Sequence, residues 1–287
     1  TDSIAYYSKL AKENEKENNY KEVLFFIQKS INYCKKNNKT KDEANQTFKL
    51  GKIYFDLKLY NDAIEVLKKS ISISNTVSQK PNKETAVTYY YLGLTYIEKK
   101  KYSLAEACIL KAEEIQKNFN DKNFTDSINL QKGILAKKNN NNPLALSLFG
   151  SIAAKPESES LAKTEALYQT GIIEAEKKRY NLALNYFNKA LELNKKTKNF
   201  DQQANILLAI STAYDKQLDK TAAYTYLKKY LNLKESITLA NDEKLGINDY
   251  DAFKKAQRTH EELLKVKENK EKEKNDKFSK LIRILVS

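Results

Sequence analysis

The sequence is poor in the residues that break helices. Its 287 residues include six glycines and three prolines, and such low numbers are typical of a chain that is helical almost throughout. Tryptophan and methionine are absent. A chain of this length without even an initiator methionine is expected to be a processed or excised region of a longer protein.

Residues that carry catalysis or bind metals are equally scarce. The one histidine, His260, precedes Glu261 and Glu262 but lacks a second histidine four residues on, so this segment indicates a helix surface rather than a zinc site. There is no glycine-rich phosphate loop, no Gly-x-Ser-x-Gly elbow and no Cys-x-x-Cys pair. These absences predict a non-enzymatic chain without a cofactor or metal.

Arginine is also rare, although the chain is basic. The formal net charge is +14, from 51 Lys and Arg against 37 Asp and Glu, but only Arg179, Arg258 and Arg283 are arginines. Recognition of phosphates and base edges favours arginine, and the lysines are spread along the chain. We therefore expect a solvated surface rather than a nucleic-acid partner, with an electrostatic role at an anionic lipid or nucleic acid as the alternative.

A small residue recurs along the chain at a nearly constant interval, and a second series of mostly alanines follows the first at a constant offset. The first series is Ala11, Gly51, Gly93, Gly133, Gly171 and Ser211, and the second is Val23, Ala63, Ala105, Ala145, Ala183 and Ala223. Small residues at a fixed separation allow two antiparallel helices to approach closely. The spacing therefore predicts about six copies of one helical hairpin.

The best copies resemble a known repeat. One reads Leu50-Gly51-x-x-Tyr54 and then Tyr60-x-x-Ala63-x-x-x-Leu67, and the next repeats this from Leu92-Gly93 to Ile109 and Ala112. This pattern resembles the tetratricopeptide repeat. The resemblance implies an all-α, right-handed superhelical solenoid of about six hairpins over residues 1–240. The period is near 40 rather than 34, so we expect longer second helices or longer connections.

The resemblance also implies where a ligand would bind. Tetratricopeptide arrays form a concave groove lined by the first helix of each hairpin. The family's inward positions fall here on Asn45, Phe48, Lys52, Phe55, Tyr90, Leu94, Ile97, Tyr168, Ile172, Leu208 and Thr212. This apolar and aromatic lining suits an extended peptide or a helix of a partner. The alternative is that the tyrosines pack against neighbouring helices. The lysine and asparagine set of the family's carboxylate-clamp subclass is not present.

The two cysteines, Cys34 and Cys108, fall in the second helices of the first and third hairpins. Stacked hairpins lie about 10 Å apart, so the two thiols are expected ~20 Å apart, beyond disulfide reach. Both are predicted to be small core residues with free thiols.

Residues 241–287 differ in character from the repeats. Positions 250–287 predict one long helix, since they contain neither glycine nor proline. Between Lys267 and Lys277 every residue is charged or asparagine, which predicts a solvated spacer. From Phe278 to Val286 the chain is mostly apolar again. We expect the start of a truncated transmembrane helix here, or alternatively an amphipathic end that docks on the solenoid or on a second copy.

This order of elements is similar to that of tetratricopeptide sensor histidine kinases and one-span regulators of Bacteroidetes. The resemblance implies the extracytoplasmic (periplasmic) sensor region of an inner-membrane signal-transduction protein, anchored outside this chain. It also allows a homodimer through the C-terminal helix. Alternatives are a soluble cytoplasmic adaptor or peptide-responsive regulator, and a scaffold of an envelope complex.

Overall fold

A computed structural model describes residues 3–17, 19–77, 81–119, 121–155, 161–244 and 269, with side chains as far as residue 237 in the last long range. These residues form twelve α-helices. They are α1 (Ser3–Lys16), α2 (Tyr20–Lys36), α3 (Thr40–Asp56), α4 (Tyr60–Val77), α5 (Lys83–Glu98), α6 (Tyr102–Gln116), α7 (Lys122–Lys138), α8 (Asn142–Ala153), α9 (Leu161–Glu176), α10 (Tyr180–Thr197), α11 (Phe200–Lys216) and α12 (Lys220–Lys244).

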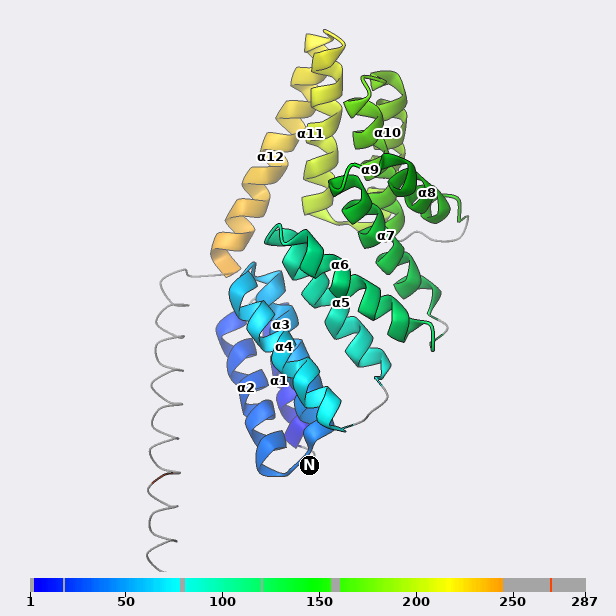
Figure 1. Ribbon diagram of the computed structural model, residues 1–287. Coiled ribbons are helices and arrows are strands. Elements are labelled where there is room, and N and C mark those ends of the chain that lie inside the picture. The colour runs from blue at the N-terminus through cyan, green and yellow to red at the C-terminus, as the bar shows by residue number, and fades with distance from the viewer. Residues whose placement is uncertain are drawn as a thin grey trace, which may run out of the picture.

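Consecutive helices pair into six antiparallel hairpins, and the hairpins stack in chain order. Figure 1 shows the stack rising from α1 and α2 at its base to α11 and α12 at its top. The all-α solenoid of six hairpins predicted from the sequence is therefore confirmed. The buried apolar side chains form three clusters along the stack, as expected when each hairpin contacts mainly its neighbours.

The turns inside the hairpins share one geometry. In five of them the middle residue has a positive φ, between 57° and 67°; these residues are Lys58, Lys100, Asn140, Lys178 and Leu218. The next residue donates its backbone N–H to a carbonyl five residues back, as Lys101 does to Tyr96 at 2.8 Å. This is a left-handed helix cap. Such a turn ends the first helix and starts the second within three residues.

The predicted small residues lie where the paired helices meet. Ser211 donates its hydroxyl to the Ala223 carbonyl at 2.8 Å, and a Cβ added to Gly93 would stand 3.4 Å from the Ala105 carbonyl oxygen, so residues of the two series are in contact. A large side chain lies nearer still. A Cβ added to Gly51 would stand 2.7 Å from Leu67, and one added to Gly93 would stand 2.8 Å from Ile109. The partner is therefore a large apolar side chain that fills the space left by the glycine. It lies one helical turn beyond the alanine of the second series. Those alanines are also fully buried, for example Ala63 and Ala105.

The extra residues of the long period lie in both expected places. The second helices α4 and α10 reach 18 residues, and the connection between α8 and α9 spans residues 154–160. Helix α8 is an exception among the second helices, with only 12 residues. In the fourth hairpin the long period therefore comes from the connection to α9 rather than from the length of the second helix.

Neither cysteine forms a disulfide, as predicted, but their environments differ. Cys34 is buried, whereas Cys108 is only half-buried, and burial raises the pKa of the Cys108 thiol to about 11. Helix α12 continues to Lys244, four residues beyond the boundary predicted at 240. His260, the apolar end at 278–286 and all of the charged spacer except Asn269 lie outside the described residues. Among the helices that are described, none has the length and apolarity needed to cross a bilayer.

Candidate functional site

The predicted inward-facing residues lie on the first helices of their hairpins, α3, α5, α9 and α11. Leu208 and Thr212 on α11 are exposed, and the other nine are half-buried. They form two groups. One group lies on α3 and α5 near the N-terminal end of the stack, and the other lies on α9 and α11 near the C-terminal end.

The C-terminal group lines a pocket of about 400 Å³ between α9 and α11. All four residues predicted on these helices border it, namely Tyr168, Ile172, Leu208 and Thr212. The remaining lining residues are Ala175, Glu176, Tyr180, Phe187, Asn205, Ala209, Ala213 and Lys216. The volume is within the range of ligand pockets. We refer to this site as the concave pocket.

Tyr168 forms part of the wall of the concave pocket through its ring. The ring centroid lies 5.9 Å from that of Phe187 at an interplanar angle of 41°, and Phe187 is fully buried against Gly171. Burial raises the pKa of Tyr168 to about 12, with a smaller contribution from the Glu165 carboxylate. The hydroxyl therefore stays protonated at neutral pH and can donate a hydrogen bond.

A ladder of polar contacts crosses α7, α9 and α11 beside the concave pocket. Lys137 Nζ lies 3.3 Å from Glu176 Oε1 and donates to Gln169 Oε1 at 3.4 Å. Gln169 donates to Glu165 at 2.8 Å, and Gln202 of α11 donates to the other oxygen of that carboxylate at 2.8 Å. Burial lowers the pKa of Lys137, although Glu176 opposes the shift. The ladder connects three successive first helices and leaves the apolar pocket open beside it.

Lys137 was missed in the sequence, and a signal for it was available. It lies four residues after Gly133, as Phe55 lies four residues after Gly51 and Ile97 after Gly93. The fourth hairpin matches the repeat pattern poorly, so no inward positions were projected onto it. The same projection would have identified Lys137.

The N-terminal group packs around Tyr91, a residue that the sequence did not single out. The ring centroid of Tyr91 on α5 lies 5.7 Å from those of both Phe48 and Phe55 on α3, with edge-on geometry. Lys52 Nζ lies 5.8 Å from the Tyr91 ring centroid and 2.7 Å from Asp56 Oδ2. These aromatic and cation–π contacts hold α3 against α5.

Tyr90 is largely occupied by contacts within the solenoid. Its ring packs edge-on against Phe124 at 5.4 Å, and its hydroxyl accepts from Gln131 at 3.5 Å. Burial raises its pKa to about 12. The alternative role for the tyrosines, packing against a neighbouring helix, therefore describes Tyr90. For Asn45, Leu94 and Ile97, which are half-buried, ligand binding stays a prediction.

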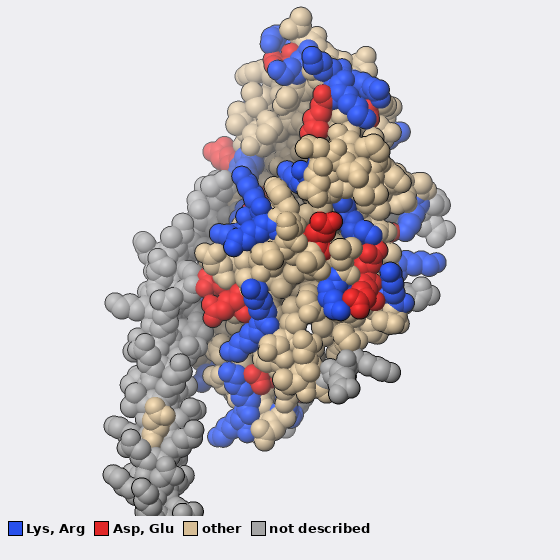
Figure 2. All heavy atoms as spheres, viewed as in Figure 1, with Lys and Arg blue, Asp and Glu red and all other residues tan. Residues whose placement is uncertain are grey.

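The described surface offers little else of a catalytic or electrostatic kind. Within these residues no three His, Cys, Asp or Glu side chains are grouped as they would be around a metal ion. Figure 2 shows lysine and arginine side chains dispersed over the visible face with acidic side chains among them, rather than gathered into a single stripe. This distribution agrees with the spread of charge inferred from the sequence.

The comparisons with known proteins agree with the repeat pattern. Residues 43–118 and residues 164–197 match the tetratricopeptide repeat. No curated protein matches the chain.

Similar solved structures include those of RapI and of the quorum sensor NprR. The apo form of RapI is 15% identical, with a TM-score of 0.67 over 83% of this chain and 85% of that one. The apo quorum sensor NprR from B. thuringiensis is 16% identical, with a TM-score of 0.65 over 88% of this chain and 72% of that one. NprR in complex with its cognate peptide NprX is 16% identical, with a TM-score of 0.61 over 89% of this chain and 76% of that one. At these identities the likeness concerns the fold. The chain therefore carries tetratricopeptide repeats and stacks them into a helical solenoid.

Proposed function

We propose that this chain is a non-catalytic binding module that holds a peptide segment of a partner protein in its concave groove. The observation that carries the proposal is the concave pocket, because four residues chosen from the repeat pattern alone line it together. Inward positions of a solenoid that merely filled space would leave no pocket of this size between α9 and α11.

The lining of the concave pocket indicates what it would hold. Ile172, Leu208 and the ring of Tyr168 supply apolar surface for one medium-sized apolar side chain. The amide of Asn205 and the hydroxyl of Thr212 suit the backbone N–H and C=O groups of an extended peptide. Lys216 and Glu176 also line the pocket, and their opposite charges would select the residues that flank the buried one.

The similarity to NprR supports a peptide rather than a small molecule as the ligand. NprR has been seen with its cognate peptide NprX on a solenoid of similar fold. The present chain shares the fold at only 16% identity, so the sequence of its own peptide cannot be taken from NprX. It has to be found by selection from random peptides.

The test is a selection of peptides followed by a matched pair of variants. Random dodecapeptides are displayed on phage and selected on the purified chain, and the affinity of one selected peptide is measured by fluorescence anisotropy. Leu208→Arg places a charge in the concave pocket and is expected to weaken binding at least about tenfold. Leu144→Arg is the control, because Leu144 is a similarly exposed leucine of α8, at 48% against 39% for Leu208. Equal affinity for both variants would reject the proposal.

We further propose that this binding acts in signalling by a membrane-bound sensor, with the soluble adaptor and the envelope scaffold as alternatives. The support is the sequence alone, namely the charged stretch at 267–277 followed by the mostly apolar residues 278–286. The test is fractionation of the full-length natural protein. Retention in the membrane after a salt wash favours the sensor, whereas recovery of the whole protein in the soluble fraction would reject it.

A further inference from the structure

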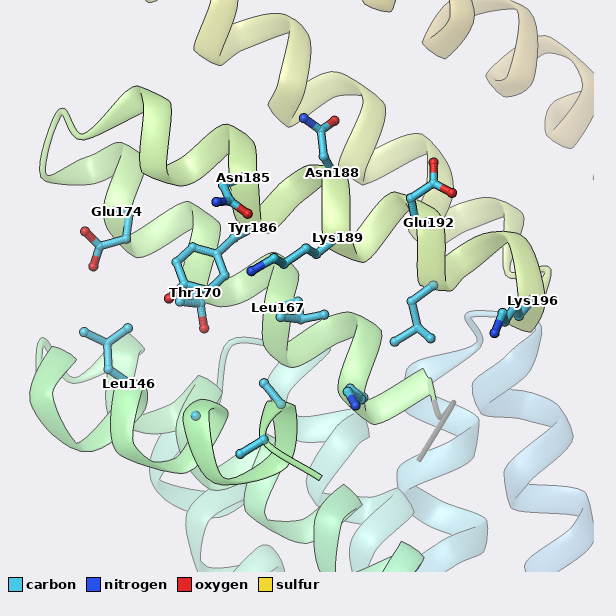
Figure 3. A pocket seen from close by; sticks show the side chains of 15 residues that line it. Leu146, Leu167, Thr170, Glu174, Asn185, Tyr186, Asn188, Lys189, Glu192 and Lys196 are labelled. Carbon is cyan, nitrogen blue, oxygen red and sulfur yellow. The ribbon is translucent and has the colours of Figure 1, made fainter. Parts of the chain in front are cut away.

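A second and larger hollow lies on the outer side of the stack, between the second helices α8 and α10 with α9 as its floor. Its volume is about 1180 Å³. Figure 3 shows Lys189 of α10 directed into this space, Tyr186 extending from α10 toward Thr170 of α9, and Leu146 of α8 on the facing wall. We call this site the convex groove.

At two repeat positions on the floor of the convex groove, α9 has smaller side chains than the corresponding helices of three other hairpins. The residue three places after the small repeat residue is Tyr54, Tyr96 or Tyr214 in three other hairpins, but it is Glu174 in α9. The residue just before the small one is leucine or isoleucine in those hairpins, but it is Thr170 in α9. A phenol ring and a branched alkyl group are thus replaced by smaller side chains. Packing that those three hairpins complete with larger side chains is incomplete here.

The wall formed by α8 widens the convex groove further. Helix α8 is the shortest helix in the described chain and has no charged residue. It presents Gly150 and Ala153 to the groove, and a Cβ added at Gly150 would meet no atom within 4 Å. Among the described residues, therefore, no side chain occupies the space beside Gly150 of α8.

The shape of the convex groove suits a helix. Its lining residues on α10 recur at spacings of three and four from Asn185 to Lys196, which is about 16 Å or three turns. Leu182 continues this stripe by one turn and is 40% exposed. Most of these lining residues are polar, but Leu182, Tyr186 and Leu193 follow one another at spacings of four and seven and form an apolar stripe on which a partner helix can lie.

The charges along the convex groove select an acidic partner. Lys163, Lys189 and Lys196 line the groove. Residues 142–155 and 161–197 together contain eight Lys and Arg residues and four Glu residues. The two carboxylates that line it are already paired with cations. Glu174, which is 5% exposed, lies 3.2 Å from Arg179 and 3.4 Å from Lys177. Glu192 lies 2.7 Å from Lys195.

We propose that the convex groove binds an amphipathic α-helix of a partner protein, separately from the peptide in the concave pocket. The apolar face of the partner helix packs on Leu146, Leu167 and Leu193, and its Asp and Glu flanks face the three lysines. The two sites lie on opposite sides of α9, so one chain can hold two segments at the same time.

The test uses a designed probe, since the natural partner is not identified. The probe is a fluorescein-labelled helical hexadecapeptide with Leu at positions 3, 7, 10 and 14 and Glu on both flanks, and a second peptide carries Lys in place of each Glu. Binding is measured by anisotropy at low salt. Gly150→Leu adds an apolar side chain where a Cβ meets no atom within 4 Å, and leucine favours a helix over glycine, so its melting temperature should equal or exceed that of the wild type.

We expect the acidic probe to bind the wild type and to lose about tenfold or more in affinity to Gly150→Leu. Lys189→Glu should weaken it about fivefold, and the basic probe should bind at least about tenfold more weakly than the acidic one. Leu208→Arg, in the concave pocket, should leave the affinity for the acidic probe unchanged. This result would distinguish binding in the convex groove from binding in the concave pocket.

Several results would overturn the proposal. They are no binding of the acidic probe, equal binding of the basic probe, and unchanged affinity for Gly150→Leu. Loss of affinity in Leu208→Arg alone would place the probe in the concave pocket. A wild-type dimer in sedimentation that Gly150→Leu converts to a monomer would assign the groove to a second copy of the chain instead.

Discussion

Gly171 of α9 lies directly against the ring of Phe187 of α10, and a Cβ at residue 171 would stand 2.5 Å from Cε1 of that ring. The same relation holds between Gly133 and Phe149, where the distance to Cε1 would be 2.4 Å. Both rings are fully buried. In these two hairpins the paired helices therefore pack through a phenylalanine ring that contacts the backbone of the opposite helix at a glycine.

Gly171→Ala should destabilise the solenoid for this reason. The buried ring of Phe187 has to move, and such overpacking costs about 1–3 kcal/mol. The control is Gly150→Ala in α8, where the added methyl group meets no atom and alanine should gain about 0.5–1 kcal/mol over glycine. Urea denaturation followed by circular dichroism measures both. A Gly171→Ala variant as stable as Gly150→Ala would contradict this account of the repeat glycines.

Leu218→Gly should stabilise the last hairpin. Leu218 has φ of 67°, a left-handed conformation that costs a non-glycine residue about 1–2 kcal/mol, and its side chain is 78% exposed. Glycine removes that strain and loses little packing, so we expect a gain of about 1 kcal/mol. Leu110→Gly, in the interior of α6, is the control and should lose stability. Thermal unfolding distinguishes the two, and a lower melting temperature for Leu218→Gly would be inconsistent with a strained cap.

The repeat pattern made the fold predictable from the sequence. Tyr60, Tyr102 and Tyr180 each stand three residues before an alanine of the second series, and each is the first residue of a second helix. Such positions are set by local turns and by contacts that recur in every hairpin, so one good copy predicts the others. Four residues that line the concave pocket, Tyr168, Ile172, Leu208 and Thr212, were identified for the same reason, because they occupy inward repeat positions.

Features that depart from the repeat could not be predicted in this way. Tyr91 lies outside the inward positions, and its role arises from its contacts with Phe48 and Phe55 of the preceding hairpin. The convex groove depends on what is missing, namely bulk at Thr170 and Glu174 and length in α8. A missing side chain becomes visible only when the surrounding helices are in place.

Tyr90 and Tyr168 should make stability depend on high pH. Burial raises the pKa of each to about 12 against about 10 in an unfolded chain. The folded state therefore holds the phenolic proton more tightly. The contribution of each buried phenol to the free energy of unfolding is fully present below pH 10. It falls by about 2–3 kcal/mol for each tyrosine as the pH rises from 10 to 12.

Replacement of these tyrosines by phenylalanine should remove that dependence. Between pH 9 and 12, Tyr90→Phe should lose about 2 kcal/mol less than the wild type, and the double variant with Tyr168→Phe should lose less again, since α5 and α9 belong to different hairpins. Urea titrations at each pH give the comparison. Parallel losses in the wild type and both variants would show that neither phenol is buried in solution.

The location of the bound peptide tests the central claim most directly. Hydrogen–deuterium exchange of the chain is measured with and without a peptide selected on it from the phage library. The account predicts slower amide exchange in α9 and α11 around Ile172 and Leu208, which line the concave pocket. Slower exchange confined to other helices, or no change at a saturating peptide concentration, would contradict peptide binding in the concave groove.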